Sequence, residues 1–205
     1  MRRWGLTVWV LVALAGGCGR STPVPNDTFY RFAAPRVAKT NAQPLTSGVL
    51  LVQTIASDSL YGERALLYSD DSANLTLKRY HYHYWGDAPP RLLRQQLVQY
   101  LRAAKAAPIV VSELDGEADH IVRGRIKRFE HVLGKEGALA RVALELRLED
   151  RGGHTLLLKD YQVDKLAAEQ DVASVVAAFD DAVNEVFGQF LADAVRASAT
   201  ASNGS

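Results

Sequence analysis

Alternating and continuous runs of hydrophobic residues predict several short strands in the first half of the chain. Residues 29–32 form a short aromatic run, and residues 64–69 and 75–84 are further predicted strands. Residues 48–55 are apolar almost without interruption, which is typical of a strand covered on both faces. The pattern therefore predicts a sheet whose central strand lies early in the chain.

A first amphipathic helix is predicted after these strands. Asp87 is predicted to cap it, because a carboxylate can accept hydrogen bonds from free backbone N–H groups, and Pro89 and Pro90 are tolerated in a first turn. Pro108 prevents the helix from continuing. The apolar face is formed by residues at helical spacing, namely Leu93, Leu97, Tyr100, Leu101 and Ala104.

The second half of the chain predicts a strand hairpin. Residues 109–111 are predicted to be a short buried strand, and residues 120–133 alternate with a phase shift near Arg128 that indicates a β-bulge. Residues 142–149 alternate cleanly, and the turn at 151–154 leads into a partner strand over 155–163. Charged side chains on neighbouring strands are expected to pair on the exposed face: Arg123, Arg125 and Lys127 with Glu145 and Glu149.

The last helix has the strongest pattern in the sequence. Asp171 is predicted to cap it. Its broad apolar stripe must be buried against the sheet or a partner, and comprises Val172, Val175, Val176, Phe179, Val183, Val186, Phe187, Phe190, Leu191 and Ala194. Residues 197–205 are small and polar, and we expect them to form a disordered tail.

These elements and the composition indicate one domain of the α+β or α/β class over residues 28–196. The chain has 205 residues, of which 48% are hydrophobic and 23% charged, as in ordinary globular proteins. The expected architecture is a mixed, mostly antiparallel sheet with two main amphipathic helices packed on it.

The first 17 residues have the three parts of an export signal. Arg2 and Arg3 precede a short apolar run, and small residues follow it. The only cysteine, Cys18, comes directly after Gly16 and Gly17, and the sequence Leu-Ala-Gly-Gly-Cys resembles the bacterial lipobox, although Ala15 stands where a larger aliphatic residue is usual. Lipid attachment is therefore expected at Cys18, and the alternative is an ordinary secretory leader with an incidental cysteine.

Acylation at Cys18 would anchor a folded domain to a membrane through a tether. Two or three acyl chains hold a protein stably at a bilayer, and residues 18–27 are polar and contain proline. In lipoprotein sorting an Asp after the cysteine causes retention at the inner membrane. Because that residue is Gly19, we expect the periplasmic face of the outer membrane of a Gram-negative bacterium.

The charge and the motifs exclude several function classes. The formal net charge is +1, which argues against a nucleic-acid-binding protein. The sequence has no phosphate-binding Gly-rich loop followed by Lys and no Gly-x-Ser-x-Gly, so an ATPase is excluded and no catalytic residues are predicted.

Two groups of residues are candidate metal sites. His81 and His83 are two apart on a predicted strand and could share an ion, but the alternative is that they cover one side together with Trp85 while Tyr80, Tyr82 and Tyr84 pack on the other. The acidic segment with Glu113, Asp115, Glu117 and Asp119 lacks the pattern of a Ca²⁺ loop. No metal and no cofactor are predicted.

Three features together resemble the ABC-type transport auxiliary lipoprotein family, of the paraquat-inducible protein C type. The lipobox is followed by the aromatic run 29–32, and the apolar run 48–52 leads to residues 60–64, Leu-Tyr-Gly-Glu-Arg, similar to a Tyr-Leu-Asp-Arg region of the family. Residues 82–89 with Trp85 are similar to the Trp-x-x-Pro start of the family's first helix.

The resemblance implies an envelope lipoprotein that serves a lipid-transport system with an ATPase, a permease and MCE-domain proteins. Such a protein would act without catalysis, by docking these partners, and homo-oligomers are one option. Aromatic residues often anchor interfaces, so Tyr61, Tyr84 and Trp85 are the candidates for partner contact, and the alternative is that they pack under the first helix. A lipid-binding carrier and an envelope enzyme are the rival functions.

Overall fold

The computed structural model describes residues 25–37, 44–58, 60–70, 76–134 and 137–202, which build one open sheet and two helices. The sheet is centred on β6 (His120–Gly134). One edge of β6 pairs in parallel with β2 (Val49–Ser57) and further along with β3 (Ala65–Ser69), and the turn η1 (Leu60–Gly62) lies between those two strands. The other edge pairs with β7 (Gly137–Asp150).

The remaining strands extend the sheet outward. β8 (Thr155–Leu166) pairs with β7, β4 (Lys78–Trp85) pairs with β3, and both pairs are antiparallel. β1 (Thr28–Tyr30) and β5 (Ile109–Val111) are parallel edge strands beside β4 and β2. The long β6–β7–β8 ladders carry most of the paired residues, which confirms the predicted mixed, mostly antiparallel α+β sheet.

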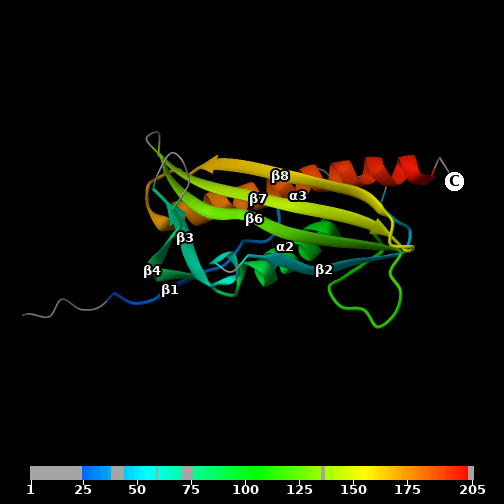
Figure 1. Cartoon of the computed structure of the whole chain (residues 1–205), viewed down its shortest axis with the longest axis horizontal. Helices are drawn as coiled ribbons and strands as arrows, with labels where there is room; N and C mark the ends of the chain where they lie inside the picture. Colours follow the sequence, from blue (N-terminus) through cyan, green and yellow to red (C-terminus); the bar gives the residue numbers. More distant parts are fainter. Residues whose placement is uncertain (1–24, 38–43, 59, 71–75, 135–136, 203–205) are drawn as a thin grey trace, which may run out of the picture.

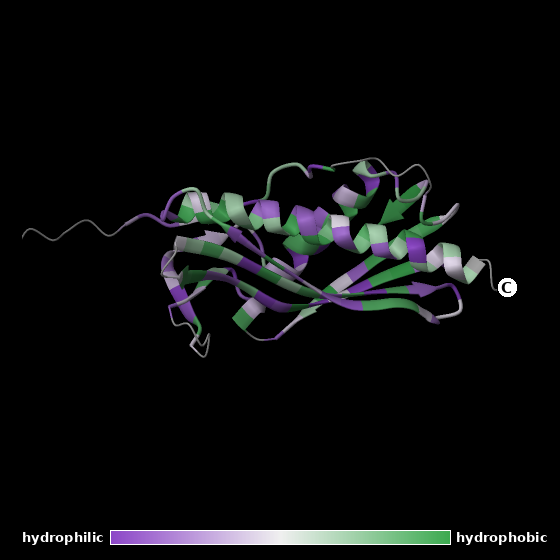
Figure 2. Ribbon diagram, turned by 90° about the horizontal axis from the view of Figure 1, so that it is seen from above, coloured by the Kyte–Doolittle hydropathy of each residue, from purple (hydrophilic) through white to green (hydrophobic). Residues whose placement is uncertain are grey.

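Both helices cover the same face of the sheet. α2 (Pro89–Ala103) packs on β2, while α3 (Val172–Ser202) runs along β7 and β8 (Figure 1). Figure 2 shows that the opposite face carries no helix, and we call it the helix-free face. Among the described residues, neither helix is apolar enough over a sufficient length to cross a bilayer.

The space between sheet and helices is filled by aromatic rings. Trp85 of β4, Phe129 of β6 and Phe179 of α3 meet with ring centroids 4.7–5.5 Å apart. Tyr100 of α2 contacts Phe187 of α3 in the same core. Burying such a side chain contributes about 1.5–3 kcal/mol, so the predicted apolar stripe of the last helix supplies much of the stability.

The boundaries of the last helix differ from the prediction at one end. Asp171 caps its start as predicted, because its Oδ1 accepts a hydrogen bond from the N–H of Ser174 at 2.9 Å. The prediction of a disordered tail from residue 197 was wrong for residues 197–202, which are helical. Ser198 is buried one turn after Ala194, so the buried stripe continues further than the apolar residues alone indicate.

Two local predictions were also wrong. Ala88, not Asp87, is the N-cap of α2, because Pro89 and Pro90 have no N–H to offer; Asp87 accepts from the N–H of Ala88 instead. The strand β5 lies at the edge of the sheet, so Ile109 is exposed and only Val110 is buried. The predicted bulge near Arg128 is confirmed by the shift in the pairing of β6 with β7.

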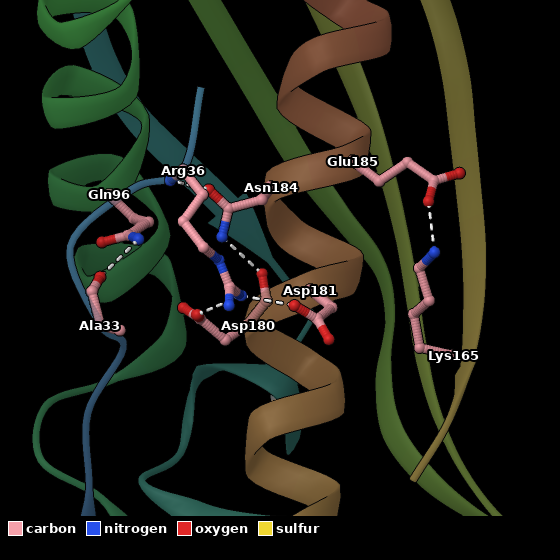
Figure 3. Close-up of polar contacts among 8 residues, drawn as sticks. All are labelled: Ala33, Arg36, Gln96, Lys165, Asp180, Asp181, Asn184 and Glu185. Atoms are coloured by element: carbon pink, nitrogen blue, oxygen red, sulfur yellow. Dashed lines mark hydrogen bonds and ion pairs between the residues drawn. The ribbon is translucent and has the colours of Figure 1, made fainter. Parts of the chain in front are cut away.

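A segment that the sequence did not single out crosses the helices. Residues 31–37, which we call the strap, pass between α2 and α3 (Figure 3). Gln96 donates from Nε2 to the carbonyl of Ala33 at 2.9 Å, and the N–H of Arg36 donates to Oδ1 of Asn184 at 2.9 Å. The strap thus joins the N-terminal part of the chain to both helices.

Candidate docking surface

The helix-free face is covered by charged side chains that pair with one another. Arg123 donates to Glu149 at 2.9 Å, which confirms one of the ion pairs expected across β6 and β7. Arg125 instead contacts Asp58 at 3.4 Å, and Lys127 contacts Asp160 at 3.7 Å. Such pairs contribute little to stability individually, but they leave this face polar and electrically balanced.

Tyr61 lies in η1 and its hydroxyl reaches this face. The hydroxyl donates to Oε2 of Glu130, and Oε1 of the same carboxylate accepts from Arg128 at 3.1 Å. Glu130 is only 2% exposed. Burial and the bond to this carboxylate raise the pKa of Tyr61, so the hydroxyl stays protonated. The ring of Tyr61 is half-buried, and its hydroxyl is occupied by a contact within the protein.

Tyr84 forms the second aromatic group near this face. Its ring stacks on Phe29 of β1 with centroids 5.6 Å apart, and the guanidinium group of Arg64 lies 5.2 Å from the centroid of the Phe29 ring. The Tyr84 hydroxyl donates to the carbonyl of His81 at 2.9 Å. Phe29 is 56% exposed, so this stack offers an apolar surface next to a cation.

A shallow hollow opens beside Tyr84. Its volume is about 790 Å³, and Leu60, Leu77, Tyr80 and Tyr84 provide its apolar lining. Arg79 and Glu63, also in the lining, form an ion pair of 2.7 Å. The hollow therefore combines ring surfaces with two arginines, Arg79 in an ion pair and Arg64 over the ring of Phe29, a mixture that suits a protein side chain.

Trp85 does not belong to this surface. The expectation that it contacts a partner was wrong, because its side chain is 1% exposed and packs between Phe32, Phe129 and Phe179. Neighbouring residues of a strand point to opposite faces, so Tyr84 and Trp85 cannot both line one surface. Of the three candidates, the structure brings Tyr61 and Tyr84 toward the helix-free face and places Trp85 in the core.

His81 and His83 are not brought together. The pairing of β4 with β3 is irregular between Ala65 and Leu67, and this breaks the alternation that the sequence predicts. Tyr80 consequently lies on the side of His83, with the rings 5.6 Å apart, and His81 is exposed. Nδ1 of His83 is 2.9 Å from the hydroxyl of Tyr30.

The acidic segment is dispersed as well. Asp119 accepts from the N–H of Val49 at 2.7 Å and pairs with Arg151, while Glu113 lies 3.9 Å from Arg94. Within the described ranges, His, Cys, Asp and Glu side chains form no group of three or more that could hold a metal ion.

His131 is a buried histidine that was not singled out from the sequence. His131 follows the bulge of β6 and lies on the inner side with Phe129, and its Nδ1 is 2.7 Å from the hydroxyl of Tyr80. Its Nε2 is buried without a hydrogen-bond partner, and burial lowers the pKa of His131. The phase shift near Arg128 was the signal in the sequence that places this ring inside.

Cys18 lies outside the described residues. The described chain begins at Pro25 and enters the fold through β1, next to Phe29 and Tyr84. Residues 25–27 therefore approach the domain at the end where the ring of Phe29 is exposed.

Solved structures share this fold. Protein XCC0632 from Xanthomonas campestris superimposes with a TM-score of 0.75 at 20% identity, over 86% of this chain and 99% of that one. A second, uncharacterized protein has a TM-score of 0.64 at 14% identity, over 84% of this chain and 98% of its own. At these identities the likeness concerns the fold.

No curated protein matches the sequence. A family model does match, over residues 30–190, which include all eight strands except the first two residues of β1, the whole of α2 and most of α3. The lipobox lies before this matched region, so the match is independent of the leader. The chain therefore belongs to the family of ABC-type transport auxiliary lipoprotein components.

Proposed function

We propose that this lipoprotein is a non-enzymatic docking component of an ABC/MCE-type lipid-transport system, held at the periplasmic face of the outer membrane through acylated Cys18. Its family serves ABC-type transport, which makes an ATPase and a permease the expected neighbours. MCE-domain proteins are the proposed direct partners. The tether would raise the local concentration of the contact without any chemistry in this chain.

The observation that carries this proposal is the filled core beneath a hollowed, helix-free face. A carrier would need an apolar cavity between sheet and helices large enough for an acyl chain. Here the rings of Trp85, Phe129 and Phe179 occupy that space, with ring centroids 4.7–5.5 Å apart. Docking through a surface is therefore favoured over carrying a lipid inside the domain.

The arrangement of polar groups also favours docking over catalysis. A catalytic site usually presents a nucleophile and a base that converge on a cleft. Around the hollow beside Tyr84, Arg79 is paired with Glu63 and Lys78 with Asp70, while Arg64 donates to the carbonyl of Trp85. Aromatic rings with Arg beside them and a polar rim are typical of protein interfaces.

Tyr84→Ala tests the docking surface. We expect this variant to lose capture of the MCE-domain protein in crosslinked membranes and to weaken the envelope barrier, because an exposed aromatic stack with Phe29 is removed. The melting temperature should change little, since Tyr84 is only half-buried, on the strand next to the edge strand β1.

Two further variants make the result specific. Gln99→Ala is the surface control, because Gln99 is exposed on α2 on the other side of the molecule and should leave capture unchanged. Trp85→Ala should act only through stability, by about 3–5 kcal/mol for a buried aromatic residue. Normal capture by a stable Tyr84→Ala protein would contradict docking at this surface.

A further inference from the structure

Exposed hydrophobic side chains gather at the end of the domain from which residues 25–27 lead away. Leu133 is the second-last residue of β6 and Leu166 ends β8; they lie close together because Leu133 pairs with Ala138 and Leu166 with Leu139. Figure 1 shows the end of β6 and the start of β7 at the same end of the long axis as β1 and β4, which carry Phe29 and Tyr82. We call this the tether end.

The concentration of these side chains is uneven along the molecule. Within the described ranges seven large hydrophobic side chains are exposed, and four of them, Phe29, Tyr82, Leu133 and Leu166, lie at the tether end. Leu166 is the most exposed of all, at 61%. Single exposed hydrophobic residues need no explanation, but four of the seven lie at one end of the long axis, and a contact at this end would account for that bias.

Several charges at the tether end are compensated. Lys78 pairs with Asp70, and Arg79 pairs with Glu63 at 2.7 Å, whereas Arg64 contacts the carbonyl of Trp85 and the ring of Phe29. A surface that binds anionic headgroups mainly by charge carries a cluster of several unpaired cations. The tether end instead offers mainly apolar and aromatic groups, which suit the headgroup region of a bilayer, where Tyr is enriched.

The length of the chain before β1 points to the same occupant. Phe29 lies 11 residues after Cys18, and an extended chain of that length spans at most about 40 Å. Residues 25–27 leave the domain at this end, so acyl chains on Cys18 would hold the tether end close to the bilayer. The tether therefore gives the bilayer a high local concentration at the four side chains.

We propose that the tether end rests on the bilayer, with Phe29, Tyr82, Leu133 and Leu166 in the headgroup region. This inference rests on the acylation of Cys18 in the proposed function. It also deepens that function, because the domain then stands on its end. The C-terminal end of α3 points away from the membrane, and the helix-free face is turned sideways toward a partner (Figure 1).

Fluorescence quenching by lipids tests this orientation. The acylated protein is reconstituted in phosphatidylcholine vesicles whose acyl chains carry bromine, which quenches tryptophan only at short range. Leu166→Trp and Phe29→Trp place reporters at the tether end. Leu158→Trp is the matched control, since Leu158 is also exposed on β8 but lies eight residues, or about 27 Å, from Leu166.

The wild-type protein gives the background, because Trp85 is the one tryptophan after the leader and is buried. We expect loss of most of the added emission in Leu166→Trp and Phe29→Trp, and no loss in Leu158→Trp. Equal quenching of all three, or quenching of none in protein that floats with the vesicles, would overturn the proposed orientation while leaving acylation intact. Failure of the native protein to float would overturn the anchored function, and this inference with it.

Discussion

The guanidinium group of Arg36 lies 2.9 Å from Oδ2 of Asp180, a residue 144 positions later in the chain. Arg36 belongs to the strap that follows β1, and Asp180 lies on the buried side of α3 (Figure 3). Burial raises the pKa of Asp180, and the nearby positive charge of Arg36 opposes this effect. The pair therefore joins the part of the chain next to the tether to the helix that forms most of the core.

Arg36→Ala is expected to lower the free energy of unfolding by about 1–2 kcal/mol. The reason is that the substitution leaves the Asp180 carboxylate buried without its cation, which costs more than the loss of an exposed ion pair. Urea unfolding of the domain measures the change.

Lys165→Ala is the control for this prediction. Lys165 of β8 pairs with Glu185, which lies on α3 as Asp180 does. Both side chains of this pair are more than a third exposed, so the expected change in the free energy of unfolding is below about 0.5 kcal/mol. Equal effects of the two substitutions would show that the burial of Asp180 is unimportant.

Val183→Asp is expected to prevent stable accumulation of the protein. Val183 is fully buried in α3, and an unpaired carboxylate there costs several kcal/mol against a total stability of about 5–15 kcal/mol. Ala177→Asp, on an exposed position of the same helix, should accumulate normally. Immunoblots of cell fractions and thermal melts make the comparison, and an unchanged melting temperature for Val183→Asp would contradict the assignment of this stripe to the core.

Stability should decrease as the pH falls below about 6.5. Burial lowers the pKa of His131 from its ordinary value of 6.5, so the unfolded chain takes up a proton at a higher pH than the native protein does. The contribution of neutral His131 to the free energy of unfolding is complete above pH 6.5, and it is lost as the pH falls toward the lower pKa of the native protein. Melting temperatures between pH 8 and pH 5 should show this decline.

His131→Phe should flatten that pH dependence, because the ring against Tyr80 remains while the titrating group is removed. A smaller slope should persist through His120, whose pKa is also lowered by burial. His81→Phe is the control, since His81 is exposed and its replacement should leave the slope unchanged. An unchanged slope in His131→Phe would exclude His131 as its source.

Cys18→Ala should block maturation. Acyl transfer needs the thiol, and the lipoprotein peptidase acts only after that transfer, so the variant should retain residues 1–17 and stay attached through its apolar leader. Mass spectrometry of the N-terminus with density-gradient fractionation distinguishes it from the wild type, which should begin at an acylated Cys18 in the outer-membrane fraction. A wild-type protein that begins elsewhere, or is recovered free of membranes, would contradict the lipoprotein assignment at this residue.

The periodic parts of the chain could be predicted from their residues alone. The stripe around Val183 and Phe187 predicts α3, and the alternation around Leu144 and Leu146 predicts the hairpin of β7 and β8. These patterns are readable because one face of each element must be apolar to be buried. The lipobox at Cys18 is likewise a local signal, and the family match over residues 30–190 agrees with the resemblance that the motifs imply.

The orientation of single side chains depended on tertiary structure. Tyr84 and Trp85 are equally aromatic in the sequence, and alternation places them on opposite faces, but only the packing against Phe129 and Phe179 shows that Trp85 meets the core. The strap contact between Arg36 and Asp180 joins residues too far apart for any local pattern, and so does the gathering of Phe29 and Leu166 at one end. A periodic pattern reports only which face of an element is buried, whereas the neighbours across that face are set by the packing of the whole chain.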